Sequence, residues 1–207
     1  MNFTDFTTRL AQQQLKNLSI VDDFKEGTLK PDAENIILNL TNQGLQDITT
    51  RIKLFEGRGS ITFVAGQNIY DISGFSDYVK ILTIFDEDEL LYNPKTSAHI
   101  TLPSPKTVRF SDKFMEDKTA VDALFHASHG VIGVTDDIEL PPNLIEALAL
   151  YVAGLYISHM GSPEHTQKGD SYYGLYLNML STDEQRNTSG ASEVVDEDAR
   201  FADRGFV

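Results

Sequence analysis

The chain contains no cysteine and no tryptophan among its 207 residues. The absence of cysteine excludes disulfides, thiolate catalysis and cysteine-based zinc or iron–sulfur sites, and it fits assembly in a reducing cytoplasm. No segment reads as a membrane span, which needs about 20 apolar residues, and the N-terminal MNFTDFTTRLAQQQ lacks the basic start and apolar core of a signal peptide. Since 41% of the residues are hydrophobic and 10% aromatic, we expect a folded domain, or a core with one inserted subdomain.

Positive charge is also scarce. Seventeen Lys and Arg residues face 31 Asp and Glu residues, which gives a net charge of −14 and a pI of about 4.6. Such a surface repels phosphates, because ordinary DNA binding depends on Lys and Arg releasing counterions. Two interpretations stay open: an ordinary soluble acidic protein, or a surface past which DNA must move without adhering.

Hydrophobic periodicity predicts two helices near the N-terminus. We expect a polar helix over 4–18 and, after a connector, a longer helix over 31–55 that begins at Pro31. Gly44 lies on the apolar face of the second helix, where it would permit close approach of another backbone. The other residues of that face are Ile37, Leu40, Ile48, Ile52 and Phe55.

The pattern changes after Gly57 and Gly59, which we expect to end the second helix. Short runs rich in Ile, Val, Phe, Tyr and Thr follow, separated by Gly, Pro, Asp and Asn, as in antiparallel sheets. Ala65-Gly66 is predicted to form a hairpin turn, and residues 86–88 another. The predicted strands lie near 60–64, 67–72, 78–85, 89–92, 107–110, 121–126, 131–134 and 138–140.

The most informative stretch is the helix predicted over 143–160, which is apolar nearly all the way round. A helix of this kind must be buried on every side. A chain of this length has few elements with which to surround it, so we expect neighbouring subunits to supply part of the cover and predict an oligomer. A further helix, over 164–181, carries Tyr residues at helical spacing. The residues predicted to pack between subunits are Leu148, Val152, Leu155, Tyr172 and Tyr176.

These elements predict an α+β fold. A helical bundle core would comprise residues 1–58 and 141–182, and residues 59–140 would form an inserted antiparallel β-sandwich or barrel. An extended C-terminal tail is expected over 183–207, polar and acidic at first. Its end alternates Arg with apolar residues and suits docking onto a neighbour or another protein. The predicted docking residues are Arg200, Phe201, Arg204, Phe206 and Val207.

The sequence offers few candidates for chemistry. His126 and His129, with Asp136 and Asp137 close by, could bind a metal. Their spacing in a predicted strand places the two imidazoles on opposite faces, however, which favours ordinary surface residues. His159 and His165 have no serine or cysteine partner in a recognisable motif, and the stretches GQNIYDISG and HGVIGV do not match a phosphate-binding loop. We therefore predict no catalytic, cofactor-binding or metal site, and no enzyme.

The order of these segments and their residue composition resemble those of a known family. LNLTNQGLQDITTRI leads into ITFVAGQNIYDISGFSDYVKILTIF at 61–85, and the strand block closes with DIELPPNLIEALALYVAGLYI at 137–157, before a helix with spaced Tyr residues. This arrangement, with its extended tail, resembles the head-to-tail adaptor proteins of tailed bacteriophages, the tail tubular A-like group of short-tailed phages in particular. The first helix and the connector at 19–30 match least well.

The resemblance implies a structural protein of the virion, located at the head–tail junction and assembled in the host cytoplasm. Such adaptors form a twelve-fold ring beneath the portal protein, extend the DNA channel and give the tail or nozzle protein a docking surface. Their C-terminal segments reach up to the portal. DNA passes through without specific binding, so we expect a channel lining with few Lys or Arg residues. Asp183, Glu184 and the acidic residues of 86–89 are candidates for that lining.

Three other functions remain open. The chain could be another ring or nozzle subunit of the phage tail, with a similar layout. It could be a carbohydrate-binding module with a helical stalk, although sugar sites favour stacking aromatics and the chain has no Trp. The last of the three is a His/Asp metal hydrolase, which would require the two histidines to converge on one metal ion.

Overall fold

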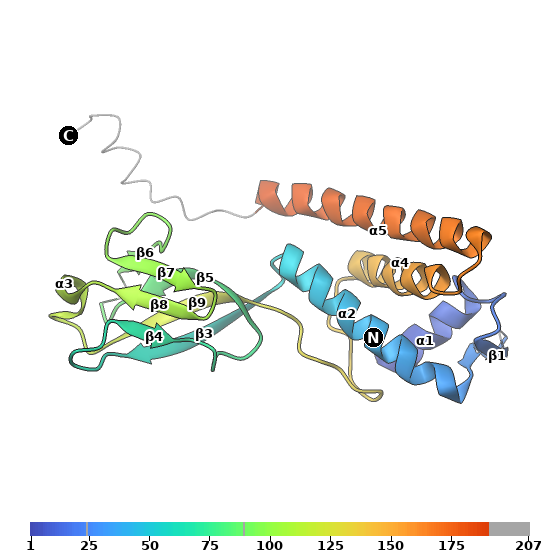
Figure 1. Cartoon of the computed structure of the whole chain (residues 1–207), viewed down its shortest axis with the longest axis horizontal. Helices are drawn as coiled ribbons and strands as arrows, with labels where there is room; N and C mark the ends of the chain where they lie inside the picture. The colour runs from blue at the N-terminus through green and yellow to red at the C-terminus, as the bar shows by residue number, and fades with distance from the viewer. Residues whose placement is uncertain (24, 89, 191–207) are drawn as a thin grey trace.

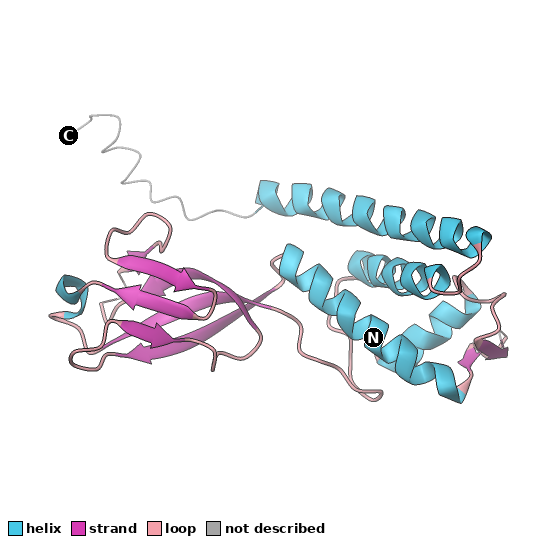
Figure 2. Ribbon diagram, viewed as in Figure 1, coloured by secondary structure: helices cyan, strands magenta, loops and turns pink. Residues whose placement is uncertain are grey.

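The computed structural model describes residues 1–23, 25–88 and 90–190 (Figure 1). Within these ranges the chain is a mixed α+β protein with five helices and antiparallel sheets. Four helices gather at one end, and the larger sheets with one short helix lie at the other (Figures 1 and 2). We call these the helical part and the β part. The helices are α1 (Phe3–Gln12), α2 (Pro31–Arg51), α3 (Asp112–Met115), α4 (Pro142–Ser158) and α5 (Pro163–Gly190).

The N-terminal segment departs from the prediction. Helix α1 begins after Asn2, whose side chain caps it by accepting the N–H of Asp5 at 2.7 Å. It ends at Gln12, well before the predicted 18, and the connector that follows contains a small antiparallel pair, β1 (Val21–Asp23) with β2 (Thr28–Leu29). This strand pair was not predicted, because the segment is polar and its two strands are too short to show an alternating hydrophobic pattern.

Helix α2 begins at Pro31 as predicted, but it stops at Arg51 and the chain then enters a strand. Gly57 and Gly59 lie inside that strand, so the prediction that they end the helix was wrong. A Cβ at Gly57 would stand 2.3 Å from the Phe125 ring, and one at Gly59 would stand 2.4 Å from the Phe75 ring. These glycines make room for aromatic rings packed over the strand.

The β part contains two antiparallel sheets. One has the strand order β3–β9–β5–β6 and the other β4–β8–β7, and the described strands do not close into a barrel. The strands predicted at 78–85 and 107–110 are confirmed, whereas β7 was missed. The strands are β3 (Phe55–Thr62), β4 (Ile69–Asp71), β5 (Tyr78–Phe85), β6 (Leu91–Tyr92), β7 (Ile100–Ser104), β8 (Thr107–Phe110) and β9 (Ala120–Ala127).

One turn prediction was right and one was wrong. Residues 86–88 lie in the connection between β5 and β6, which pair with each other as antiparallel neighbours. Ala65-Gly66 instead joins β3 to β4, which belong to different sheets. The turn there is tight, with Gly66 at φ +79°, but it carries the chain from one sheet to the other.

The segment over 128–141 is an extended loop, so the strands predicted at 131–134 and 138–140 are absent. The Asn42 side chain replaces a strand partner: its Nδ2 donates to the Ile132 carbonyl at 3.0 Å, and its Oδ1 accepts the Ile132 N–H at 2.8 Å. Further along, Ile138 N–H donates to the Met1 carbonyl at 2.7 Å. The backbone N–H and C=O groups of this apolar segment are therefore hydrogen-bonded to a side chain and to the N-terminal residue instead of to a strand. One isolated β-bridge joins Asn2 and Asp137.

Two hydrophobic clusters correspond to the two parts. The larger joins α1, α2, α4 and α5, and it includes Ile132 and Ile138 of the extended loop. The smaller joins residues of both sheets, such as Ile84 of β5 and Val108 of β8. The stacked pair of Phe110 and Phe114, with ring centroids 5.5 Å apart, fills the end of the second cluster near α3.

Candidate assembly surfaces

Helix α4 is buried as predicted, but its cover comes from its own chain. Leu148 and Val152 have no exposed surface in the single chain, because α5, α2 and α1 pack around the helix. The argument that this burial requires neighbouring subunits was therefore wrong. Glu146, the one acidic residue of the helix, is also satisfied within the chain, by the Arg9 guanidinium and by Gln14 Nε2 at 3.3 Å.

Helices α4 and α5 cross at very close range. A Cβ at Gly154 would stand 3.1 Å from the Gly169 carbonyl oxygen, and one at Gly169 would stand 2.6 Å from the Gly154 carbonyl oxygen. Two glycines facing each other let the backbones touch, so little else can occupy this crossing. The role of Gly169 was not predicted from the sequence. The pattern that could have indicated it is a glycine on each side of the helix break at 161–163, Gly154 before it and Gly169 after it.

Tyr176 ties α5 to α2 within one chain. It is fully buried, and its hydroxyl donates to Asp47 Oδ2, which also accepts from Arg51 Nε at 3.0 Å. Burial and the hydrogen bond to Asp47 both raise the pKa of Tyr176, so the hydroxyl stays protonated. The rings of Tyr151 and Tyr173 pack against it with centroids 5.1 and 5.6 Å away. This residue is thus used inside the chain, where we predicted contact with a neighbour.

The other predicted packing residues, Leu155 and Tyr172, are only partly buried against the helical cluster. Tyr172 lies on α5, whose outer face is open to solvent. Between Ser171 and Thr182 this helix has no charged residue, and Leu175 is 51% exposed on it. Helix α5 has 28 residues and α4 has 17, so at about 1.5 Å per residue α5 projects well past its partner (Figure 1).

The extended loop forms a second exposed surface, on the side of the helices away from α5 (Figure 1). Val131 is 87% exposed on it. The loop is held by His129 N–H, which donates to Thr49 Oγ1 at 3.0 Å, and by the Gly133 N–H, which donates to Asp136 Oδ2 at 2.8 Å. Val134 is also exposed on the loop, at 39%, and the two valines together make the loop a candidate contact for another molecule.

The acidic residues of the β5–β6 turn are structural. Asp86 is buried, and it accepts from Tyr92 Oη at 2.9 Å and pairs with Lys118 Nζ at 3.2 Å. Burial raises the pKa of Asp86, but the hydrogen bonds from Leu90, Tyr92 and Lys118 outweigh it and the net shift is downward.

Glu87 in the same turn accepts the N–H groups of Thr119 and Ala120 at 2.9 and 3.1 Å. Asp86 is thus buried and committed to holding the turn, which argues against its assignment to a channel lining. Glu87 and Asp88 are exposed, and their place in such a lining stays a prediction. Glu89 and the side chains of Asp183 and Glu184 lie outside the description.

The two candidate metal-binding histidines do not converge. His126 is buried on β9, whereas His129 follows the strand and accepts the Glu139 N–H at 3.1 Å through Nε2. Asp136 holds the Gly133 N–H, and Asp137 bridges to Asn2. Across the described ranges, no group of three or more His, Asp or Glu residues is arranged to hold a metal ion, and no helix there is both long and apolar enough to span a bilayer.

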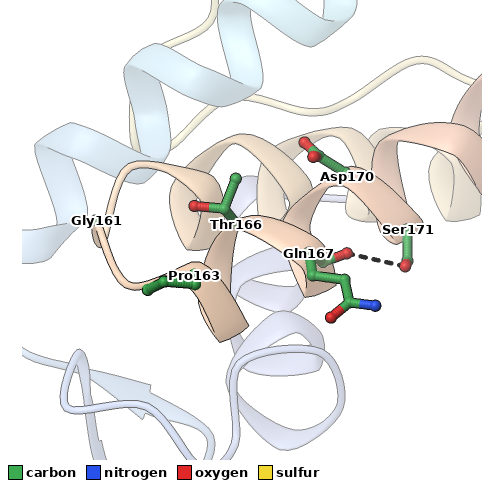
Figure 3. Close-up of a pocket in the computed structure, with 6 residues that line it drawn as sticks. All are labelled: Gly161, Pro163, Thr166, Gln167, Asp170 and Ser171. Carbon is green, nitrogen blue, oxygen red and sulfur yellow. Dashed lines mark hydrogen bonds between the residues drawn. The ribbon is translucent and has the colours of Figure 1, made fainter.

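A shallow hollow opens beside the turn from α4 to α5 (Figure 3). Its walls contain one carboxylate, Asp170, and a helical hydrogen bond from Ser171 Oγ to the Gln167 carbonyl at 2.9 Å. Next to it, Ser162 Oγ accepts the His165 N–H at 3.2 Å and lies 2.7 Å from His165 Nδ1. His165 therefore has a serine partner that we did not predict, but the geometry is that of a helix N-cap. The lining residues are Gly161, Pro163, Thr166, Gln167, Asp170 and Ser171.

The predicted docking tail, Arg200, Phe201, Arg204, Phe206 and Val207, lies outside the described residues. Helix α5 reaches Gly190, so the segment from 183 to 190, which we expected to be extended, is helical. No protein-family model matches this chain, and a search of curated proteins finds no significant match.

Proposed function

We propose that this chain is a structural protein of a tailed-phage virion, a head-to-tail adaptor. Its copies form a ring, of twelve by the resemblance, that joins the portal to the tail or nozzle and extends the DNA channel. The tail residues 199–207 dock onto the portal. The helical part acts as a bundle that builds the ring, the β part is a sandwich inserted into it, and the chain carries no enzymatic chemistry and no cofactor.

The observation that carries this proposal is the position of the two exposed surfaces of the helical part. A closed ring is built from heterologous contacts, in which one surface of a subunit meets a different surface of the next. The uncharged stretch of α5 from Ser171 to Thr182 and the loop with Val131 lie on opposite sides of the helices (Figure 1). The net charge of −14 adds support, since an acidic channel would let DNA pass without adhering.

The carbohydrate-binding alternative loses support. Sugar sites present exposed aromatic rings, and from Met1 to Thr182, leaving out residues 24 and 89, every Phe and Tyr is buried or only partly exposed. The aromatic residues of the β part pack against one another instead, as Phe63 does with Phe110 at a centroid distance of 5.1 Å.

The test is the mass of the purified full-length chain, measured by sedimentation alone and in the presence of a phage portal protein. We expect a ring in at least one condition. Leu175→Asp, on the outer face of α5, should prevent ring formation without lowering the unfolding temperature. Leu102→Asp, at an exposed leucine of the β part, is the matched control. A chain that stays monomeric in both conditions contradicts the proposal.

A further inference from the structure

His126 lies where the helical part meets the β part. It is 1% exposed, and on β9 it stands directly opposite Glu56 of β3 and Lys80 of β5. Residues directly opposite in a sheet point to the same face, so the three side chains form a row. The backbone of Thr49 and Ile52, at the end of α2, lies beside the imidazole. We call this contact the junction.

The backbone of Thr49 and Ile52 approaches the imidazole, but neither ring nitrogen of His126 makes a well-formed hydrogen bond. A buried polar side chain is normally paired, and an unpaired one needs an explanation. The carboxylate of Glu56 is held by Lys53 Nζ at 2.7 Å, so it is already neutralised. The charged groups that face His126 are therefore Lys80 from β5, Lys53 from the end of α2 and the paired Glu56 from β3.

A proton on His126 would place a buried cation between two lysines with one carboxylate already in use. Burial, followed by the charge of Lys80, lowers the pKa of His126 below its ordinary value, and together these effects outweigh the backbone of Thr49 and Ile52, which acts in the opposite direction. The closed junction therefore accommodates the neutral ring and disfavours the charged ring. The ring can gain a proton readily only when the junction opens and water reaches it.

The junction is also the natural place for motion. Two described segments connect the parts, residues 52–54 and the extended loop (Figure 1). The first begins with Ile52, whose backbone adjoins the His126 imidazole, and the second follows directly after β9. His129, on the second segment, touches Phe55 of the first with ring centroids 5.6 Å apart. The two hydrophobic clusters have no residue in common, so opening here would change the relative orientation of the parts and leave each cluster intact.

We propose that His126 is a pH-sensitive latch between the helical part and the β part. The neutral ring keeps α2 packed on β9, and protonation opens the junction and frees the two parts to reorient. The latch is independent of the adaptor function and would work in any assembly. Because the pKa is lower when closed than when open, the closed state is favoured above about pH 6.5 and weakens as the pH falls below it.

Hydrogen exchange of the full-length chain, followed by mass spectrometry at pH 7.5 and 5.0 with labelling times corrected for intrinsic rates, tests the latch. Peptides covering 49–56 and 120–129 should exchange faster at pH 5.0 than at pH 7.5, because the opening equilibrium shifts toward the open, protonated state as the pH falls. Peptides from α4 should not change. His126→Gln should abolish the acceleration, and His99→Gln, at an exposed histidine of the β part, should retain it.

Three results would overturn the latch: acceleration that survives in His126→Gln, acceleration shared equally by α4, or none in the wild type. If His126→Gln does not fold, imidazole NMR titration of the wild type decides. Single substitutions of the other four histidines assign their signals, and the remaining signal belongs to His126. A titration at or above about pH 6.5 would be incompatible with a latch that closes on the neutral ring.

Discussion

Gly169 and Ser158 are in direct contact where α5 crosses α4: a Cβ at Gly169 would stand 2.1 Å from Ser158 Oγ and 2.7 Å from Ser158 N. No real Cβ contact is that short, so a side chain at this position must force the helices apart. This crossing determines how α5 lies on α4 and where its outer face points.

Gly169→Ala should therefore destabilise the protein, although alanine is the better helix former. Overpacking a tight contact costs about 1–3 kcal/mol, which outweighs the gain of about 1 kcal/mol in helix propensity. Urea unfolding measures the difference. Gly174→Ala is the matched control on the same helix, where a Cβ meets nothing within 4 Å, and it should be neutral or stabilising. Equal effects of the two substitutions on stability would contradict the close packing of α5 on α4 at Gly169.

Tyr176→Phe should lower the free energy of unfolding by about 1 kcal/mol, because it removes the hydrogen bond to Asp47 while keeping the ring. Asp47 keeps Arg51 and partial exposure to water, which limits the loss. Tyr172→Phe, at a partly buried tyrosine of the same helix, is the comparison and should change little. The double substitution Asp47→Asn with Tyr176→Phe should be less harmful than the sum of the singles if the pair interacts.

Asp86 should make stability depend on pH in the acidic range. Its pKa is lowered in the folded state, so its carboxylate stabilises the fold above its unfolded pKa of about 3.9 and the contribution is lost as the pH falls below that value. Asp86→Asn should cost about 1–3 kcal/mol at pH 7. Chemical unfolding from pH 7 to 3 measures the free energy of unfolding of wild type and variant, and the difference between the two should become smaller at the acidic end. A difference that stays constant would mean that the charge of Asp86 does not contribute.

Deletion of residues 199–207 should abolish binding to the portal and leave the unfolding transition unchanged. One tail would bind weakly, because ordering its backbone opposes the burial of its two Phe side chains; a ring of tails acting together would bind firmly. Co-sedimentation with the portal measures this. Deletion of the acidic stretch 193–198 is a control for length, and portal binding that survives loss of 199–207 would remove the docking role.

The long elements were predictable because their patterns are regular. The helix starts at Pro31 and Pro142 and the strand over 78–85 follow from proline placement and β-branched runs. The extended loop was not predictable, because Val131 to Val134 have strand composition and only the tertiary contact with Asn42 excludes a ladder. Likewise, the apolar composition of α4 predicted that the helix is buried. It could not show whether the same chain or a neighbouring subunit covers it, because both kinds of burial select the same residues.

The candidate surfaces were harder to predict than the fold. Tyr176 and Tyr172 share one helix and one residue type, yet one is fully buried on Asp47 and the other is partly exposed. Helical spacing alone could not separate them, because the close crossing at Gly169 fixes how the helix is rotated about its axis. His126 was recognisable as a histidine in a strand, but its isolation depends on α2 ending against that strand.

The pairing of β3 with β9, in register from Phe55 opposite Ala127 to Thr62 opposite Ala120, bears on how the chain folds. Helices α2 and α4 are separated by some ninety residues of sequence, and closing so long a loop is entropically unfavourable, at about 0.6 kcal/mol for each doubling of its length. Once the two strands zip together, the effective loop shrinks to the short segments flanking them. Early formation of the β part would then bring α2 and α4 within reach of each other, so the speed at which the helices assemble would depend on strands that belong to the other part.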